Sequence, residues 1–182
     1  MHYFLLFIKK TLRFLLKPLS FLPALAVMYM IFAFSAQDGT ASAGLSHKVS
    51  VKLVELADRL LHRELTAAQI LIYADQIHYY VRKLGHITEY FILAVTVAFP
   101  LYVYRIRGLW LFLLAGIFCV AFAGLDEYHQ SFVAGRGPSI RDVGIDSIGI
   151  FSGILLTQFF CFIGRKTIFA PLSLSKRRHS GR

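Results

Sequence analysis

Four short clusters of polar residues interrupt a mostly apolar chain, and they contain the side chains that could bind a ligand or catalyse a reaction. The clusters are Phe34-Ser35-Ala36-Gln37, Arg82-Lys83-Leu84-Gly85-His86-Ile87-Thr88-Glu89-Tyr90, Asp126-Glu127-Tyr128-His129-Gln130, and Gly135-Arg136-Gly137 with the later Asp142 and Asp146. In the second cluster His86, Glu89 and Tyr90 have i, i+3, i+4 spacing, which places them on one face of a helix. The third cluster repeats this spacing, so each predicts a helical face that presents an acid beside an imidazole.

Carboxylates and imidazoles at such spacing could act as metal ligands or as a general acid and base. The candidates for these roles are His86, Glu89, Asp126, Glu127, His129 and Asp146. The sequence has no recognised zinc spacing such as His-Glu-x-x-His, so we predict no metal site and leave the cofactor open. No residue is specified as a nucleophile, and the reaction stays open as well.

Ligand binding needs fewer assumptions than catalysis. Arg136 with its flanking glycine amides, together with Arg141, could hold an anionic headgroup, while the carboxylates would meet hydroxyls or amines. The residues that we expect to bind a ligand are Gln37, Arg82, His86, Glu89, Tyr90, Asp126, Glu127, His129, Gln130, Arg136, Asp142 and Asp146. The structural alternative is that these side chains only join the helices to one another.

The composition identifies the elements that must position these residues. Hydrophobic residues make up 57% of the 182 residues and charged residues 16%, compared with about 45–50% and about 25% in soluble domains. A soluble fold of this size could not bury so much apolar surface, so the surplus must face lipid. Four apolar runs, residues 18–36, 84–104, 109–125 and 143–163, approach the roughly 20 helical residues that cross a bilayer core. We therefore predict an all-α membrane protein, a bundle of four transmembrane helices.

The long segment between the first two spans, residues 37–83, predicts amphipathic helices rather than a bare linker. Its apolar residues recur at helical spacing with charges between them. They are Leu45, Val49, Leu53, Leu56 and Leu60. Thr66 and Gln69 then form a capping-box signature, which opens a second helix that is able to run on into the second span.

Basic residues predict the orientation of the bundle. The net charge is +10, and the excess lies in a basic interfacial segment, residues 1–17, and a basic tail, residues 164–182. Because Lys and Arg are enriched on the cytoplasmic side, we expect both termini in the cytoplasm and residues 37–83 outside. This placement favours anchoring beside anionic lipid over nucleic-acid binding. Ala41-Ser42-Ala43 resembles a signal-peptide cleavage site, but the long apolar core before it favours a retained first helix.

Because successive spans run in opposite directions, this topology brings all four polar clusters to the outer end of the bundle. Ionisable groups within spans are costly and mark candidate functional sites. Asp142, Asp146, Gly149 and Gly153 continue as one stripe, whose glycines would let a neighbouring helix approach closely. We thus predict a polar cup at the outer mouth of the bundle.

The order and spacing of these clusters resemble the VanZ-like family of bacterial membrane proteins. The resemblance covers residues 18–163 and rests on Phe34-Ser35-x-Gln37, Arg82-Lys83-x-Gly85-His86-x-x-Glu89-Tyr90, and Asp126-Glu127-x-His129-Gln130-x-Phe132-x-x-Gly135-Arg136, followed by Asp142, Asp146 and Gly149. It implies a multi-pass protein of the bacterial cell membrane. Founding members are associated with low-level resistance to the glycopeptide teicoplanin, but the family supplies no established reaction.

Two functions follow as hypotheses. The first is a cell-envelope protein whose polar cup binds a lipid-linked or glycopeptide-type ligand, in keeping with the family's link to glycopeptide resistance. The alternative is a membrane enzyme that acts on an envelope lipid through a His/Asp/Glu site. The expected partners are the lipid bilayer and such an envelope lipid or glycopeptide, and no nucleic acid.

Overall fold

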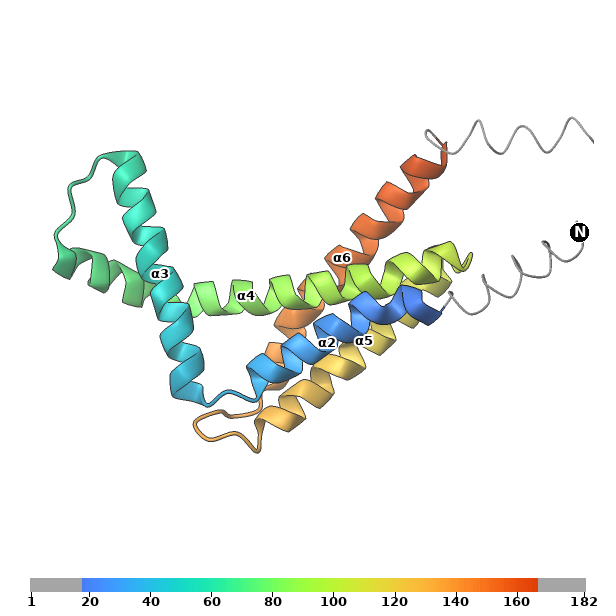
Figure 1. The fold of residues 1–182 in the computed structure, drawn as a ribbon, viewed down its shortest axis with the longest axis horizontal. Helices are drawn as coiled ribbons and strands as arrows, with labels where there is room; N and C mark the ends of the chain where they lie inside the picture. The colour runs from blue at the N-terminus through green and yellow to red at the C-terminus, as the bar shows by residue number, and fades with distance from the viewer. Residues whose placement is uncertain (1–17, 167–182) are drawn as a thin grey trace, which may run out of the picture.

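In the computed structural model, which describes residues 18–166, the regular structure is entirely helical (Figure 1). In chain order the elements are η1 (Pro18–Phe21), α2 (Leu22–Ser35), α3 (Gly39–Leu61), α4 (Ala67–Val103), α5 (Gly108–Gln130) and α6 (Ile140–Lys166). The expectation of an all-α protein is confirmed. The interfacial segment predicted for residues 1–17 lies outside the described residues, and so do residues 167–182 of the predicted tail.

In the described part of the chain, four helical segments are long and apolar enough to cross a membrane. They are Pro18–Ser35, Ala67–Val103, Gly108–Gln130 and Ile140–Arg165. Large apolar side chains such as Phe99 and Trp110 are exposed on the outside of these helices, where lipid would cover them. The chain is therefore a multi-pass membrane protein, as its apolar runs predicted.

Helix α4 begins well before the second span that the sequence placed at residues 84–104. Its start is the predicted capping box, in which the Gln69 amide donates to Thr66 Oγ1 over 3.3 Å and the Thr66 amide donates to Gln69 Oε1 over 2.9 Å. The proline inside the helix is Pro100, near its end. No proline therefore interrupts the backbone hydrogen bonds between the start of α4 and the second span. The second amphipathic helix and the second span are one continuous helix.

Helices α4 and α6 cross at close range because α6 has glycine at the contact. A Cβ on Gly149 would overlap the carbonyl oxygen of Ile87, and a Cβ on Gly153 would lie 2.7 Å from the carbonyl oxygen of Phe91. The glycine stripe thus has the packing role that its spacing predicted. Beyond the crossing, the two helices diverge toward their C-terminal ends (Figure 1).

A small buried core fixes the crossing helices. Leu93 of α4, Cys119 of α5 and Ile150 of α6 are each fully buried in one cluster, which Ile31 of α2 joins. Because close-packed cores resist rotation of their helices, this cluster determines which side chains each helix presents at the polar end of the bundle.

Helix α3 lies across α4 at the polar end of the bundle (Figure 1). Asp38 caps its first turn, since Asp38 Oδ1 accepts hydrogen bonds of 2.7 Å from the Ala41 amide and from the Thr40 hydroxyl. These bonds, the Ala41 bond first, lower the pKa of Asp38. Farther along, Ser46 Oγ lies 2.9 Å from Nε2 of His78, a residue of α4. The start and the middle of α3 are therefore both fixed in place.

The predicted amphipathic helix is present in α3, but its leucine stripe does not pack on α4. The buried side chains of α3 are Ser50 and Val54. The residues of the leucine stripe are all exposed, namely Leu45, Val49, Leu53, Leu56 and Leu60. An unpaired apolar face of this length requires an apolar environment outside the chain.

The contact between α4 and α6 can be tested with two glycines of the same helix. We expect Gly149→Ala to lower the free energy of unfolding by about 1–3 kcal/mol, because the added methyl group overpacks the contact. Gly144→Ala is the matched control, since a Cβ there would meet nothing within 4 Å. Thermal unfolding of the purified protein in detergent measures both, and equal melting temperatures for the two variants would contradict the close contact.

Candidate functional site

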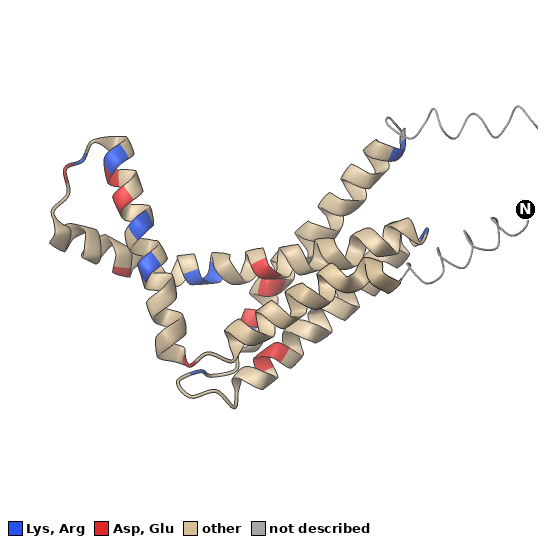
Figure 2. Ribbon diagram, in the orientation of Figure 1, with Lys and Arg blue, Asp and Glu red and all other residues tan. Residues whose placement is uncertain are grey.

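The acidic residues of the bundle lie at one end of it. Figure 2 shows Asp and Glu on α4, α5 and α6 near the start of α3, whereas the opposite ends of these helices carry only Lys and Arg. The sequence explains this distribution, since no Asp or Glu occurs in residues 1–37, 90–125 or 147–182. One end of the bundle thus combines acids and bases, and the other is purely basic.

Asp126 is the centre of a buried hydrogen-bond network between three helices. Its Oδ2 atom accepts bonds from the Ser35 hydroxyl of α2 at 2.8 Å and from the Tyr90 hydroxyl of α4 at 3.2 Å. A further bond of 3.0 Å comes from Nε2 of Gln130, one turn along α5. Asp126 is 4% exposed and Tyr90 is fully buried. A carboxylate that accepts several bonds in a dry site holds its donors firmly.

Arg136 extends this network toward the surface. Its Nη1 donates to Gln130 Oε1 over 2.9 Å, and its Nη2 donates to the carbonyl oxygen of Phe34 over 3.2 Å. The network therefore fixes the loop between α5 and α6 against the end of α2. Among the described residues 18–166, three buried polar atoms find no hydrogen-bond partner, namely Asp126 Oδ1, His129 Nδ1 and Arg136 Nε.

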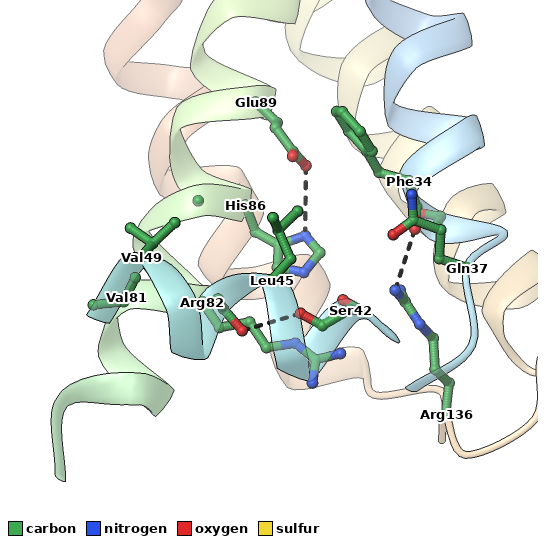
Figure 3. A pocket seen from close by; sticks show the side chains of 13 residues that line it. Phe34, Gln37, Ser42, Leu45, Val49, Val81, Arg82, His86, Glu89 and Arg136 are labelled. Atoms are coloured by element: carbon green, nitrogen blue, oxygen red, sulfur yellow. Dashed lines mark hydrogen bonds and ion pairs between the residues drawn. The ribbon is translucent and has the colours of Figure 1, made fainter. Parts of the chain in front are cut away.

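A pocket of about 220 Å³ lies beside the network, under α3. Figure 3 shows side chains from α2, α3, α4 and the α5–α6 loop around it. Five of the residues that we expected to bind a ligand line this pocket, namely Gln37, Arg82, His86, Glu89 and Arg136. Its walls thus join three of the four sequence clusters in one space.

The acidic and the basic side chains of the pocket differ in whether they have a partner of opposite charge. His86 Nδ1 lies 3.9 Å from Glu89 Oε2, so the single carboxylate of the pocket has an imidazole neighbour. Within residues 18–166, neither Arg82 nor Arg136 forms an ion pair with an acid. Burial and then the positive charge of Arg82 lower the pKa of Arg136. Two neighbouring guanidinium groups without an acidic partner favour a bound anion.

Three other expected site residues, all acidic, lie outside the pocket and the network. Glu127 Oε2 accepts a bond of 2.8 Å from the Ser139 amide, just before α6 begins. Asp142 pairs with Lys83 Nζ over 2.6 Å and so joins α6 to α4. Asp146 is buried one turn later. The contacts of Glu127 and Asp142 are those of residues that hold helices together.

His129 also lies away from the pocket lining. Its ring stacks on Phe32 of α2, with ring centroids 4.2 Å apart. The sequence placed His129 on the same helical face as Asp126, and the structure shows that this face is directed at α2. Within residues 18–166, no group of three or more His, Cys, Asp or Glu side chains is arranged to hold a metal ion.

Sequence reasoning treated two parts of the site as ordinary. Ser35 was one residue of the first cluster, yet it bonds the central carboxylate. Helix α3 was expected as an amphipathic element only, yet Ser42, Leu45, Ser46 and Val49 line the pocket. The signal for Ser35 was its place beside Gln37 at the end of a span. The sequence contains no comparable signal for the position of α3.

The Asp126 network predicts graded losses of stability. Asp126→Ala leaves the Ser35, Tyr90 and Gln130 donors without their acceptor, so the free energy of unfolding should fall by about 1–3 kcal/mol or more. Asp126→Asn should lose less, because its amide oxygen can replace Oδ2. Asp75→Ala is the control, since it removes a carboxylate that is 73% exposed and whose 2.9 Å contact with His47 Nε2 is open to solvent, so its loss should change stability little. Chemical or thermal unfolding measures the series, and a harmless Asp126→Ala change would contradict the network.

Comparison with known proteins agrees with the resemblance of the sequence clusters. A family model described as VanZ/LLP1 matches residues 20–161, which contain every residue of the pocket and of the network. Neither a search of curated proteins nor a search of solved structures returned a match. Because the family model covers most of the chain and all of the polar site, the chain belongs to the VanZ/LLP1 family.

Proposed function

We propose that this membrane protein binds the phosphorylated polar end of a membrane lipid in the pocket under α3. The observation that carries the proposal is the pair formed by Arg82 and Arg136, which line one pocket and have no acidic partner within residues 18–166. Arginine presents its donors in a planar fork that matches phosphate oxygens. A lipid phosphate would therefore neutralise the two guanidinium groups.

The other pocket side chains suit hydroxyl groups beside a phosphate. Glu89 and the Gln37 amide oxygen can accept hydrogen bonds, while the Ser42 and Ser46 hydroxyls can donate or accept them. All four line the pocket with the two arginines. Such a mixture favours a phosphate that carries a sugar or another hydroxyl-bearing group over a bare anion.

The size of the pocket favours a headgroup over a glycopeptide. Its volume of about 220 Å³ corresponds to about seven water molecules at ~30 Å³ each. Pockets that enclose drug-sized molecules measure about 300–1,000 Å³. A glycopeptide antibiotic is larger than these molecules, so only a fragment of it would enter. A link to glycopeptide resistance would then act through the lipid rather than through enclosure of the drug.

Helix α3 supports access from the membrane. Leu45 and Val49 of its leucine stripe line the pocket, so the stripe begins beside the pocket. Leu53, Leu56 and Leu60 continue the stripe beyond the pocket and are exposed. An amphipathic helix with this pattern lies in the interface with its apolar face toward the acyl chains. We infer that α3 covers the pocket and rests on the leaflet that supplies the lipid.

The proposed leaflet is the outer one. Residues 1–17 and 164–182 are strongly basic and contain no acid, and basic segments beside spans stay in the cytoplasm. Both termini would then be cytoplasmic, and α3 with the pocket would face the cell exterior or periplasm. The lipid would be a component of the cell envelope.

An enzymatic alternative rests on His86 and Glu89, whose side chains are 3.9 Å apart in the pocket. A neutral imidazole there could accept a proton from water that attacks the lipid phosphate, releasing inorganic phosphate and the lipid alcohol. Phosphate release that His86→Gln abolishes would favour this alternative. Tight binding without release favours the binding protein.

Binding of a lipid phosphate can be measured directly with farnesyl phosphate. The full chain in phosphatidylcholine nanodiscs should bind it, and Arg82→Gln should weaken binding about tenfold or more, because a hydrogen bond to a charged group contributes roughly 1.5–3 kcal/mol. Arg141→Gln is the matched control, since Arg141 is exposed at the same end but does not line the pocket. Isothermal titration calorimetry provides the dissociation constants.

Two further titrations separate the possible sources of binding. Farnesol lacks the phosphate and inorganic phosphate lacks the chain, so each should bind much more weakly than farnesyl phosphate. Equal binding of farnesol, or equal binding by the Arg82→Gln protein, would contradict the proposed recognition of a lipid phosphate.

The position of α3 on the leaflet predicts a difference between two tryptophan variants. In a Trp110→Phe background, Leu56→Trp should be quenched strongly by phospholipids brominated on the upper acyl chain, because the stripe faces lipid. Lys48→Trp, on the charged face of the same helix, should be quenched weakly. Equal quenching at both positions would mean that α3 does not rest on the membrane through its leucine stripe.

A further inference from the structure

A second cavity lies at the other end of the bundle, where α4 and α6 diverge. Its volume is about 660 Å³, and its lining is mostly apolar, the polar side chains being Tyr102, Thr157 and two arginines. Phe99, Val103 and Phe160 line it and are all more than half exposed. This groove is therefore an apolar surface that faces outward from the bundle, within the membrane-spanning part of both helices.

Arg107 and Arg165 both line this groove and lie where the spans end. Each guanidinium group stacks on an aromatic ring of the chain, Arg107 on Tyr102 at 5.0 Å and Arg165 on Phe162 at 6.0 Å. Stacking leaves the edges of a guanidinium group able to donate hydrogen bonds. The groove thus has an apolar body and a mouth with two positive charges.

No acidic residue of the chain can neutralise these arginines at their own end of the bundle. Residues 90–125 and 147–182 contain no Asp or Glu, and residues 1–37 contain none either. Figure 2 shows the same feature, since only Lys and Arg colour the helix ends there. The counter-charge at Arg107 and Arg165 must come from outside the chain.

The positive charge at the mouth also favours one of the possible occupants of the groove over the others. The terminal segments, residues 1–17 and 167–182, are basic and contain no acid in their sequence, so they supply no acidic side chain as a counter-charge. A second copy of the chain in the same orientation would present the same basic end. An anionic phospholipid has the opposite charge and an apolar body, which complements both features of the groove.

The dimensions of the groove match one leaflet. It follows α4 from Phe91 to Val103, a rise of about 18 Å along a helix axis. One leaflet contributes about 15 Å of hydrocarbon, half of the core of about 30 Å. An acyl chain that fills the groove would therefore place its phosphate at the level of the two arginines.

We propose that the groove between α4 and α6 is a specific site for one anionic phospholipid of the leaflet at the purely basic end of the bundle. An acyl chain packs along Phe91, Phe99 and Phe160, and the phosphate is held by Arg107 and Arg165. This site is separate from the pocket under α3 and does not depend on the function proposed for that pocket. Its lipid would stabilise the diverging ends of α4 and α6.

Native mass spectrometry of the full chain tests the site. Dioleoyl phosphatidylglycerol should remain bound at least tenfold more than dioleoyl phosphatidylcholine at equal concentration. The Arg107→Gln/Arg165→Gln variant should lose this preference, whereas Arg107→Lys/Arg165→Lys should keep most of it. Arg105→Gln is the matched control, because Arg105 lies at the same end but outside the groove lining.

A second variant tests the apolar body of the site rather than its charge. Cys161→Trp fills the groove and leaves both arginines in place, so it should also reduce the bound phosphatidylglycerol about tenfold. Thermal unfolding confirms that each variant is folded. Retained preference in the Arg107→Gln/Arg165→Gln protein, or undiminished binding in folded Cys161→Trp, would overturn the proposal, as would equal binding of both lipids by the unchanged chain.

The two sites respond to different variants. Binding of farnesyl phosphate at the α3 pocket should be unchanged by Arg107→Gln/Arg165→Gln, and the phosphatidylglycerol preference should be unchanged by Arg82→Gln. Failure of one site therefore leaves the test of the other intact. Loss of both farnesyl phosphate binding and the phosphatidylglycerol preference in either of these variants would contradict two separate sites.

Discussion

The carboxylate of Asp126 is the interaction on which the polar end of this protein depends. One oxygen accepts hydrogen bonds from Ser35, Tyr90 and Gln130, which belong to three helices and come from distant parts of the chain. In water each bond would contribute little, but in a dry bundle an unmet carboxylate is costly. The same bonds that satisfy Oδ2 of Asp126 therefore set the mutual rotation of α2, α4 and α5. Through Gln130 they also position Arg136 at the pocket.

A second constraint is the glycine contact between α4 and α6. Because Gly149 and Gly153 let the two backbones meet, the helices cross at one point and separate away from it. The polar pocket, covered by α3, lies toward one end of this crossing, and the apolar groove lies toward the other. The single crossing thus explains why the polar pocket and the apolar groove lie apart and differ in chemistry. The charged residues near them differ in the same way. Acidic and basic side chains lie together at the end of the pocket, and only basic side chains lie at the end of the groove.

The features that could be predicted from the sequence are those that depend on local pattern. Apolar length predicted the spans, Thr66 and Gln69 predicted a helix start, and the glycine spacing predicted the close approach of two helices. The gathering of the polar clusters at one end followed from alternating directions of the spans. These features need only the period of the helix and the thickness of the bilayer.

The division of the polar residues among separate roles depended on helix rotation, which no local pattern specifies. Glu127 is adjacent to Asp126 in sequence, yet it points to the Ser139 amide while Asp126 faces the network. His129 shares the helical face of Asp126 but stacks on Phe32. The place of α3 over the pocket also depended on tertiary contacts, because an amphipathic helix can direct its apolar stripe to protein or to lipid. Sequence reasoning therefore named residues that the structure places in the pocket and in the network, but it could not separate pocket, network and helix contacts.

The central claim is that the buried carboxylate of Asp126 positions Arg136 at the pocket through Gln130. A double-mutant cycle on the free energy of unfolding, with Asp126→Ala, Arg136→Gln and the double variant, tests it most directly. Residues in one hydrogen-bond network couple by about 0.5–3 kcal/mol, so the double variant should lose clearly less stability than the two single losses together. Strictly additive losses would show that Asp126 and Arg136 act independently, which would contradict the claim.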